Sequence, residues 1–213
     1  MALTKVRGGG VDNPLTLGGG SASDNSIVFD GNAQDFHIGL DDSTDSLTIG
    51  LGSTLGTTSH MVIDANGHIT KPLQSAFHVR KGSSANTNMV ASSYNTITFA
   101  TEVFDQNGDF ASNTFTAPVT GRYFLGFNVR LESPDSSCSH HYFEITTSNF
   151  SYVQLYDQPV TASTDFHGFS FCVLADMDAS DTAKLQYYQL GGNNTSDVTG
   201  YDAHAQFYGH LVC

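Results

Sequence analysis

Three residues in one short segment could bind a metal ion. The segment SSCSHHYF places Cys138 two residues before the adjacent pair His140 and His141, and thiolate and imidazole are common zinc ligands. Adjacent residues of a strand point to opposite faces, so one such loop supplies too few ligands for a zinc shell. We expect structural or surface roles for these residues and no metal. The alternative worth testing is a threefold axis that collects one histidine from each of three chains.

The acidic stretch Asp105–Asp109, with sequence DQNGD, looks at first like a calcium loop. An EF-hand loop requires glycine at its sixth position and a distal glutamate, and the stretch does not fit that spacing. A turn built on Asn107 and Gly108 is the favoured interpretation. We therefore expect no cofactor, and calcium stays an open alternative.

The sequence shows no catalytic motif. It has no GxSxG elbow, and its two GGG runs, at 8–10 and 18–20, lack the lysine of a phosphate loop. Acidic pairs such as Asp41–Asp42 have no distinctive spacing, although glycosidases can assemble carboxylates from distant strands. We expect a protein that is not an enzyme and has no catalytic residues.

Composition and charge narrow the class of protein further. The 213 residues include 21 Gly and only 8 Lys plus Arg against 21 Asp plus Glu, for a net charge of −13. This composition is rich in turn and strand formers, and the charge disfavours nucleic acid as a partner. No apolar run is long enough to span a membrane, and MALTKVRGGG has no signal-peptide core. We expect a protein made in the cytoplasm and not inserted into a membrane, with its three scattered cysteines as buried thiols.

The chain divides by composition into three zones. Residues 1–25 hold few apolar residues, which predicts an extended or flexible arm that docks to a partner. Residues 26–72 contain the similar segments DFHIGL (35–40) and DSLTIGL (45–51), followed by MVIDANGHIT (61–70) with a hairpin turn at Asn66–Gly67. Strands this short bury little in one chain. We therefore expect a β-rich shaft in which several chains share one core.

Residues 73–213 carry the pattern of an antiparallel β-sandwich. Apolar and polar residues alternate from Tyr123 to Leu131, and no window has helical periodicity. Further strands are expected at 76–80, 96–102, 141–145, 152–156, 166–174, 183–190 and 205–212. The chain as a whole is predicted to be all-β.

The stretch FTAPVTGRYFLGF (115–127) resembles the signature of the C1q/TNF-like jelly-roll family. The segments FATEVFDQNGDF (99–110), DTAKLQYYQLGG (181–192) and AQFYGHLVC (205–213) are similar to the family's neighbouring segments, in the same order. The resemblance covers residues 76–213. It implies a homotrimer of non-enzymatic jelly-roll heads with apolar and aromatic side chains along the threefold axis. The core residues expected are Phe115, Gly121, Tyr123, Leu125, Phe127, Phe207, Gly209 and Leu211.

A second resemblance concerns residues 1–72. IGLDDSTDSLTIG, GSTLGTT and IDANGHIT are similar to segments of bacteriophage tail fibres and other virion proteins. Together the two resemblances imply a virion structural protein, located in the virion, whose arm docks to other virion proteins. Its head would attach to a glycan or protein of the host surface. The alternative is a capsid-decoration, head-fibre or cement protein with no receptor role.

Recognition residues are expected in the loops of the head, since jelly-roll loops carry most binding functions. Tyrosine gives a rigid amphipathic contact and asparagine or aspartate gives hydrogen bonds, a mixture suited to polar surfaces such as glycans. Ordinary solvated loops are the alternative interpretation. The binding candidates are Tyr152, Tyr156, Asp157, Asn193, Asn194, Asp197 and Tyr201.

Overall fold

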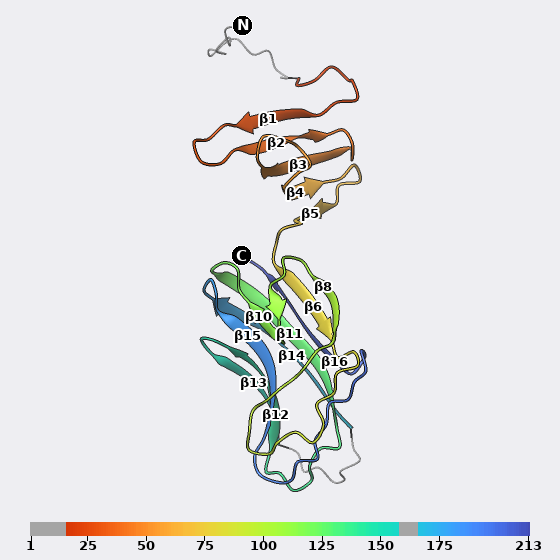
Figure 1. Ribbon diagram of the computed structural model, residues 1–213, viewed down its shortest axis with the longest axis vertical. Coiled ribbons are helices and arrows are strands. Elements are labelled where there is room, and N and C mark those ends of the chain that lie inside the picture. The colour runs from red at the N-terminus through yellow and green to blue at the C-terminus, as the bar shows by residue number, and fades with distance from the viewer. Residues whose placement is uncertain (1–15, 158–165) are drawn as a thin grey trace. The chain divides into compact units, whose positions relative to one another are not determined.

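A computed structural model describes residues 16–157 and 166–213, and these residues form an all-β protein (Figure 1). The chain divides into two compact units, Met1–Leu73 and Gln74–Cys213, which we call the stem and the head. No helix in the described part of the chain has the length and apolarity needed to cross a bilayer. The docking arm predicted for residues 1–25 lies largely outside the described residues. Residues 16–24, which are described, form bends and are exposed.

The stem is a single antiparallel sheet whose strands follow one another in chain order. Its hairpins match the predicted segments, and Gly67 has a φ of 86° in the turn after Asn66. Within this turn the Asp64 carboxylate accepts hydrogen bonds from the amides of Asn66 and His68, both at 2.9 Å. The strand before the first predicted segment was not anticipated. The strands are β1 (Asn25–Phe29), β2 (Phe36–Asp41), β3 (Ser46–Leu51), β4 (Ser59–Ile63) and β5 (Ile69–Thr70).

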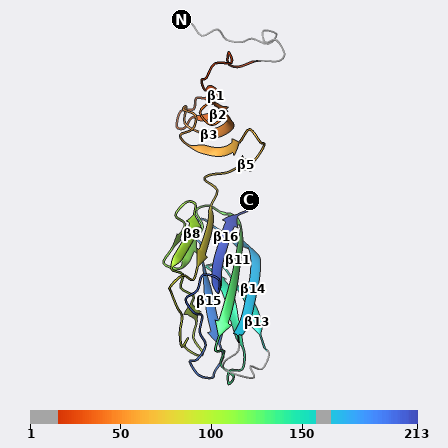
Figure 2. The same cartoon turned by 90° about the vertical axis from the view of Figure 1, so that its right-hand side faces the viewer.

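The head is a jelly roll of two sheets, with strand orders β14-β11-β16-β6-β8 and β13-β12-β15-β10-β9. Figure 2 shows β16, β11 and β14 of the first sheet side by side. The strands are β6 (Ala76–Arg80), β7 (Asn95–Thr96), β8 (Thr101–Asp105), β9 (Phe110–Ala111), β10 (Thr114–Thr116), β11 (Gly121–Glu132), β12 (His141–Thr147), β13 (Ser151–Tyr156), β14 (Phe166–Met177), β15 (Thr182–Gln189) and β16 (Ala205–Leu211).

The pairing order identifies the jelly roll. β7, β8 and β9 lie outside the eight-strand pattern. Counting the other eight strands from β6, the first pairs with the last, β6 with β16. The second pairs with the seventh, β10 with β15, and the third with the sixth, β11 with β14. The fourth and fifth form the hairpin β12–β13. This nested antiparallel pairing, wound into two facing sheets, is the double Greek key of a jelly roll.

The predicted strand at 96–102 is wrong. Residues 97–100 lie between β7, which pairs with β15, and β8, which pairs with β6 in the other sheet. The chain changes sheets here, as the Ile97 amide donates to Leu185 O and the Ala100 amide donates to Arg80 O. A run of alternating residues cannot show from sequence that its two halves pair with different sheets.

The head has one hydrophobic core between its sheets. Phe115, Tyr123, Leu125, Phe127 and Phe207 are fully buried there, and Leu211 packs at its margin. The Tyr123 hydroxyl donates a 2.7 Å hydrogen bond to Val119 O and so secures the loop that enters β11. Gly121 and Gly209 are also buried. A Cβ at Gly121 would lie 2.6 Å from Cys213 O, so close approach of the chain end requires glycine there.

Candidate functional site

An aromatic and apolar surface covers the outer side of the β14–β11–β16–β6–β8 sheet, and we call it the aromatic face. In one row, Phe124 lies between Leu174 and His210 on the two neighbouring strands. These positions alternate with the buried core residues of the same strands, so Phe124 and Tyr208 add aromatic rings to the outer side of β11 and β16. The face consists of His78, Phe104, Phe124, Leu174, Tyr208 and His210.

The second row of the aromatic face is built around Tyr208. The His78 ring makes edge-on contacts with the rings of Tyr208, at 6.1 Å, and Phe104, at 6.0 Å. Opposite Tyr208 on β11 is Gly126, where a Cβ would lie 2.6 Å from the tyrosine ring, so glycine lets the ring lie across the strand. A shallow hollow of about 460 Å³ opens over this row.

The aromatic face offers an apolar surface for contact and no catalytic arrangement. Its polar contacts are few: His78 Nε2 lies 3.2 Å from Gln206 Oε1, and Arg122 pairs with Asp176 at 2.6 Å near its margin. Leu174 is 59% exposed and Phe104 is 46% exposed. Apolar surface of this extent costs free energy in water until something covers it.

The stem sheet also has an exposed apolar side, which we call the stem face. Its strands are in register so that Ile27, Ile38, Ile49 and Met61 form one row across β1 to β4. Large side chains of the neighbouring rows are exposed as well. The exposed members of the stem face are Ile27, Phe29, Phe36, Leu40, Leu47 and Ile49.

The opposite side of the stem sheet is polar and buried. His37 and Thr48 are each 1% exposed, and His37 Nδ1 lies 2.8 Å from Gly52 O in the loop after β3. Asp41 on the same side accepts hydrogen bonds from the amide and hydroxyl of Ser43. On β2 and β3 the single chain thus buries the polar side of its sheet and exposes the apolar side, the reverse of an isolated soluble domain. Val28 of β1, on the polar side, is 38% exposed.

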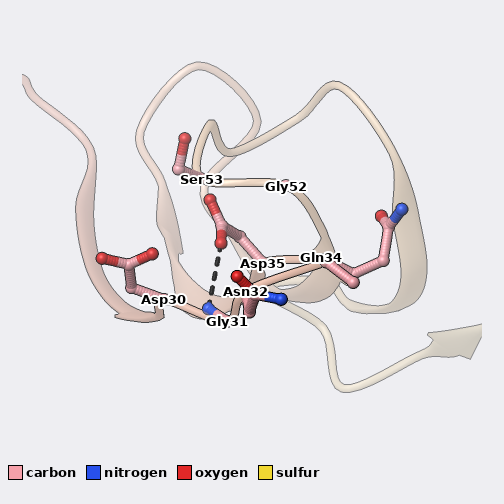
Figure 3. Close-up of a pocket in the computed structure, with 8 residues that line it drawn as sticks. Asp30, Gly31, Asn32, Gln34, Asp35, Gly52 and Ser53 are labelled. Atoms are coloured by element: carbon pink, nitrogen blue, oxygen red, sulfur yellow. Dashed lines mark hydrogen bonds between the residues drawn. The ribbon is translucent and has the colours of Figure 1, made fainter.

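A polar hollow lies beside the turn between β1 and β2 (Figure 3). Asp35 Oδ1 accepts a 3.1 Å hydrogen bond from the Gly31 amide, so this carboxylate caps the turn. The side chains of Asp30 and Gln34 diverge from Asp35 rather than meeting at one point (Figure 3). This geometry explains the turn and does not create a ligand site.

The asparagines predicted to bind a ligand hold the head's loops together. The backbone amide of Asn193 donates to the buried carboxylate of Asp135, whose pKa is lowered by hydrogen bonds from Ser137 and Asn193 against the opposing effect of burial. Asn194 Oδ1 accepts a 2.8 Å hydrogen bond from the Ala91 amide. Asn193 Nδ2 donates a 3.1 Å hydrogen bond to Ser137 Oγ, so one side-chain amide atom of each asparagine has a partner within the chain.

Asp197 also holds a loop through hydrogen bonds within the chain, whereas Tyr201 does not. Asp197 Oδ1 accepts a 2.6 Å hydrogen bond from the Asn88 amide, and its backbone pairs with Glu132. The Tyr201 ring packs against His204 at 4.9 Å and is 63% exposed. Of the candidates in this loop, Tyr201 therefore keeps the most contact surface for another molecule.

Tyr152 and Tyr156 are not loop residues, which corrects the prediction. Both lie in β13 and pack against the hydrophobic core from the same side of that strand. Tyr156 stacks on His141 at 5.3 Å. The two tyrosines share a face because side chains four residues apart in a strand point the same way. Asp157 follows the strand and is exposed, and the loop beyond it, 158–165, lies outside the described residues.

The adjacent histidines differ in environment. His141 is buried, and burial together with the charges of His167 and His140 lowers its pKa to about 4. Cys138 Sγ lies 3.7 Å from His141 Nδ1, and burial raises the pKa of this thiol. His140 is half-buried and stacks on Tyr142 instead. No group of three or more His, Cys, Asp or Glu side chains in residues 16–157 and 166–213 has the arrangement of a metal site.

The acidic stretch at 105–109 forms the turn between β8 and β9. The Asp105 carboxylate accepts hydrogen bonds from the amides of Asp109, at 2.9 Å, and Phe110, at 2.8 Å. Gly108 has a φ of 73° in this turn, a conformation that favours glycine. Asp109 Oδ2 accepts a 2.6 Å hydrogen bond from the Ser75 hydroxyl, so both carboxylates bind neighbouring parts of the chain.

Comparison with known proteins finds similarity at the level of structure alone. No family model matches the sequence, and no curated protein is significantly similar to it. The globular domain of zebrafish complement 1qA protein is similar with a TM-score of 0.45 and 18% identity, over 66% of this chain and 98% of that domain. Two structures of murine APRIL, at pH 8.0 and 8.5, each have a TM-score of 0.47, with 7% and 8% identity, over 65% of this chain and 99% of theirs. The jelly-roll assignment rests on the strand pairing described above.

Proposed function

We propose that this chain is a homotrimeric structural protein without catalytic activity, in which three stems share one apolar core. The observation that carries the proposal is the reversed stem sheet, with Ile27 and Ile49 exposed and His37 buried. Three copies that turn their stem faces inward would remove this apolar surface from water, at roughly 25 cal/mol per Å². A closed symmetric assembly of this kind also leaves no open end for further growth.

The aromatic face of the head supports the same assembly. Leu174 and Phe124 lie opposite each other on neighbouring strands, at the centre of a face with few polar groups. Apolar and aromatic residues at the centre with charges at the margin are typical of subunit interfaces. Two separate units of one chain thus each present an apolar side that a second copy can cover.

We further propose that the trimer is a virion structural protein of a bacteriophage. The support for this step is the resemblance of residues 1–72 to fibre segments, with residues 1–25 as the part that docks to other virion proteins. The head would then attach to the host surface. A capsid-decoration or cement role without a receptor is the second candidate. A shaft of about 50 residues favours it, because even fully extended it would span only about 165 Å.

Light scattering of the full chain tests the assembly. We expect three times the chain mass of 22.8 kDa, and a monomeric mass would refute the proposal. Leu174→Lys should shift the mass toward monomer, since it places three charges in the apolar contact. Leu155→Lys is the matched control, because Leu155 is 57% exposed on a strand of the other sheet, against 59% for Leu174.

Imaging of purified virions with a labelled chain tests the virion role. Binding of the trimer to host cells, with virions still intact when the chain is deleted, supports attachment. Virions that fall apart without the chain, together with no cell binding, support the cement role instead.

A further inference from the structure

Three tyrosines gather on the outer side of the β12–β15 sheet, the side opposite the core. Tyr142 and Tyr188 lie directly opposite each other on β12 and β15, with ring centroids 5.2 Å apart. Tyr94, from the loop before β7, packs its ring 5.1 Å from that of Tyr188. Its hydroxyl lies 3.3 Å from the Tyr142 hydroxyl. The three rings form one cluster, which we call the tyrosine cluster.

The tyrosine cluster plays no part in the head's core. The neighbours of these residues along the strands, Phe143 and Tyr187, point inward and are fully buried. Tyr142 and Tyr188 therefore point outward, where each is half-buried by its neighbours, and Tyr94 is 55% exposed. Three aromatic rings held together on the outer side of a sheet form a fixed contact surface, because each ring restricts the rotamers of the next.

Polar side chains lie beside the cluster on the same side of the sheet. Glu144 and Gln186 occupy the next outward positions along β12 and β15 and pair across the two strands. The Thr146 hydroxyl lies 2.5 Å from Glu144 Oε1 and 3.0 Å from Gln186 Oε1. Glu144 is 3% exposed and Gln186 is 7% exposed, so these side chains support the cluster from below and do not reach the surface. Burial and the neighbouring Tyr94 and Glu144 raise the pKa of Tyr142, so its hydroxyl stays neutral and able to donate.

We infer that the tyrosine cluster is a carbohydrate-binding site. A sugar ring has an apolar face of C–H groups, which packs on aromatic rings, and a rim of hydroxyls, which both donate and accept hydrogen bonds. The fixed rings offer the apolar surface, and the hydroxyls of Tyr94 and Tyr142 offer the hydrogen bonds. The ligand class is a neutral saccharide of a polysaccharide or glycan.

Other ligand classes fit this surface less well. Lys184 is the one basic residue that β12 and β15 carry on this side, and the chain has a net charge of −13, so a phosphate backbone would be repelled. A protein partner or second copy would also contact Val153 and Leu155 of β13, which are exposed beside Glu144 and Tyr142. The contact proposed between copies lies on the aromatic face of the other sheet, and the oligomeric mass of Tyr94→Ala distinguishes the two cases.

This inference deepens the attachment function proposed above and moves the ligand from the loops to a sheet surface. It differs from the prediction in which Asn193 and Asp197 contact the ligand. Because it concerns the other sheet from Leu174, sugar binding and trimer formation can fail independently in experiment.

Affinity electrophoresis of the full chain through gels that contain dextran, mannan, galactan or xylan tests the site. We expect at least one polysaccharide to retard the protein. Tyr94→Ala should weaken that retardation about tenfold, because an exposed ring that packs on a sugar is removed without opening the core. Tyr94→Phe keeps the ring and should weaken binding only about two- to threefold.

Tyr201→Ala is the matched control, since Tyr201 is an exposed tyrosine, at 63%, in the loop that the sequence favoured. It should leave binding unchanged. Proton NMR with methyl glucoside, mannoside and galactoside should broaden the tyrosine ring signals of the wild-type chain and not those of Tyr94→Ala. The chain has no tryptophan to complicate the aromatic region.

Three results would overturn the inference. The first is an absence of retardation by all four polysaccharides together with unchanged ring signals in the presence of the glycosides. The second is loss of binding in Tyr201→Ala but not in Tyr94→Ala, which would place the site in the loop. The third is a change of oligomeric mass in Tyr94→Ala, which would make the cluster a contact between copies.

Discussion

In the head, two sheets turn their apolar sides toward each other, and Phe127 of one packs 5.9 Å from Phe143 of the other. In the stem, one sheet has no second sheet to face, and Ile49 and Phe36 remain exposed. The sequence patterns of the two units are alike, with short alternating strands and glycine turns. The alternation of apolar and polar residues along a strand fixes which side chains share a side of the sheet. Whether that side is covered depends on whether a second sheet packs against it.

The largest effect should come from the head's core. Phe127→Ala should lower the free energy of unfolding of the head by about 3–5 kcal/mol, because it leaves a cavity among fully buried rings. Guanidinium unfolding followed by tyrosine fluorescence measures the change. Phe150→Ala is the control, since Phe150 is 62% exposed and its loss should cost less than about 0.5 kcal/mol. Equal losses in both variants would contradict the assignment of the core.

The same test in the stem distinguishes a shared core from an exposed sheet. If three stems share the stem face, Ile49→Ala should lower the free energy of unfolding of the stem by about 2–5 kcal/mol per chain. If the face stays in water, the same substitution should lower it by less than about 0.5 kcal/mol. Hydrogen exchange of the β3 amides in the full chain reports this free energy. Val28→Ala on the opposite side, in register with His37, is the control. If the β3 amides exchange slowly and Ile49→Ala leaves that rate unchanged, the stem is stable without a shared core.

Acid should destabilise the head through His141. Its pKa of about 4 in the folded chain lies below the ordinary value of 6.5, so the unfolded chain takes up this proton first as the pH falls. The stabilising contribution is complete above pH 6.5, decreases between pH 6.5 and about 4, and is then gone, a loss of up to about 3 kcal/mol. Urea unfolding between about pH 4 and pH 6.5 measures how the free energy of unfolding changes with pH. His141→Phe should reduce this pH dependence, and an unchanged dependence would show that other groups cause it.

The smallest effect should come from the turns. Asp105→Ala removes the carboxylate that accepts from two amides and should cost the head about 1–2 kcal/mol. Asp64→Ala removes the corresponding carboxylate in the stem and should speed exchange only in β4 and β5. Thermal unfolding of the head and hydrogen exchange of the stem measure the two effects. A global loss of stability from Asp64→Ala would mean that this turn is coupled to a larger core than the single sheet.

Sequence reasoning succeeded where strands were long and failed where neighbours decided the outcome. The alternation from Tyr123 to Leu131 gave the central strand β11 and its buried side. It could not show that residues 95–105 leave one sheet for the other, since pairing partners have no local signature. The predicted strand at 152–156 corresponds to β13, but its alternation did not show that Tyr152 packs against the core and lies in no binding loop.

The binding candidates in the loops remain a prediction, and the structure gives their side chains a second use. Asn194 and Asp197 have the side chains of ligand-binding loops, but such side chains equally accept hydrogen bonds from the chain's own amides. Tyr94 and Tyr188 are 94 residues apart in sequence and reveal nothing there of a common cluster. The sequence held one signal of an outward tyrosine, the adjacent pair Tyr187 and Tyr188. Because neighbouring residues of a strand point to opposite sides, one of the two must point outward.

The sequence by itself determined the fold class, the turns and the two sides of each strand, because these depend on local propensity and on a period of two. Asn66–Gly67, Gly108 and the alternation through β11 are all read from neighbouring residues. Only the tertiary structure decided which sides are covered. Burial depends on residues distant in sequence, such as Phe143 facing Phe127. The reversed stem sheet, the aromatic face and the tyrosine cluster therefore became visible only when the strands were placed side by side.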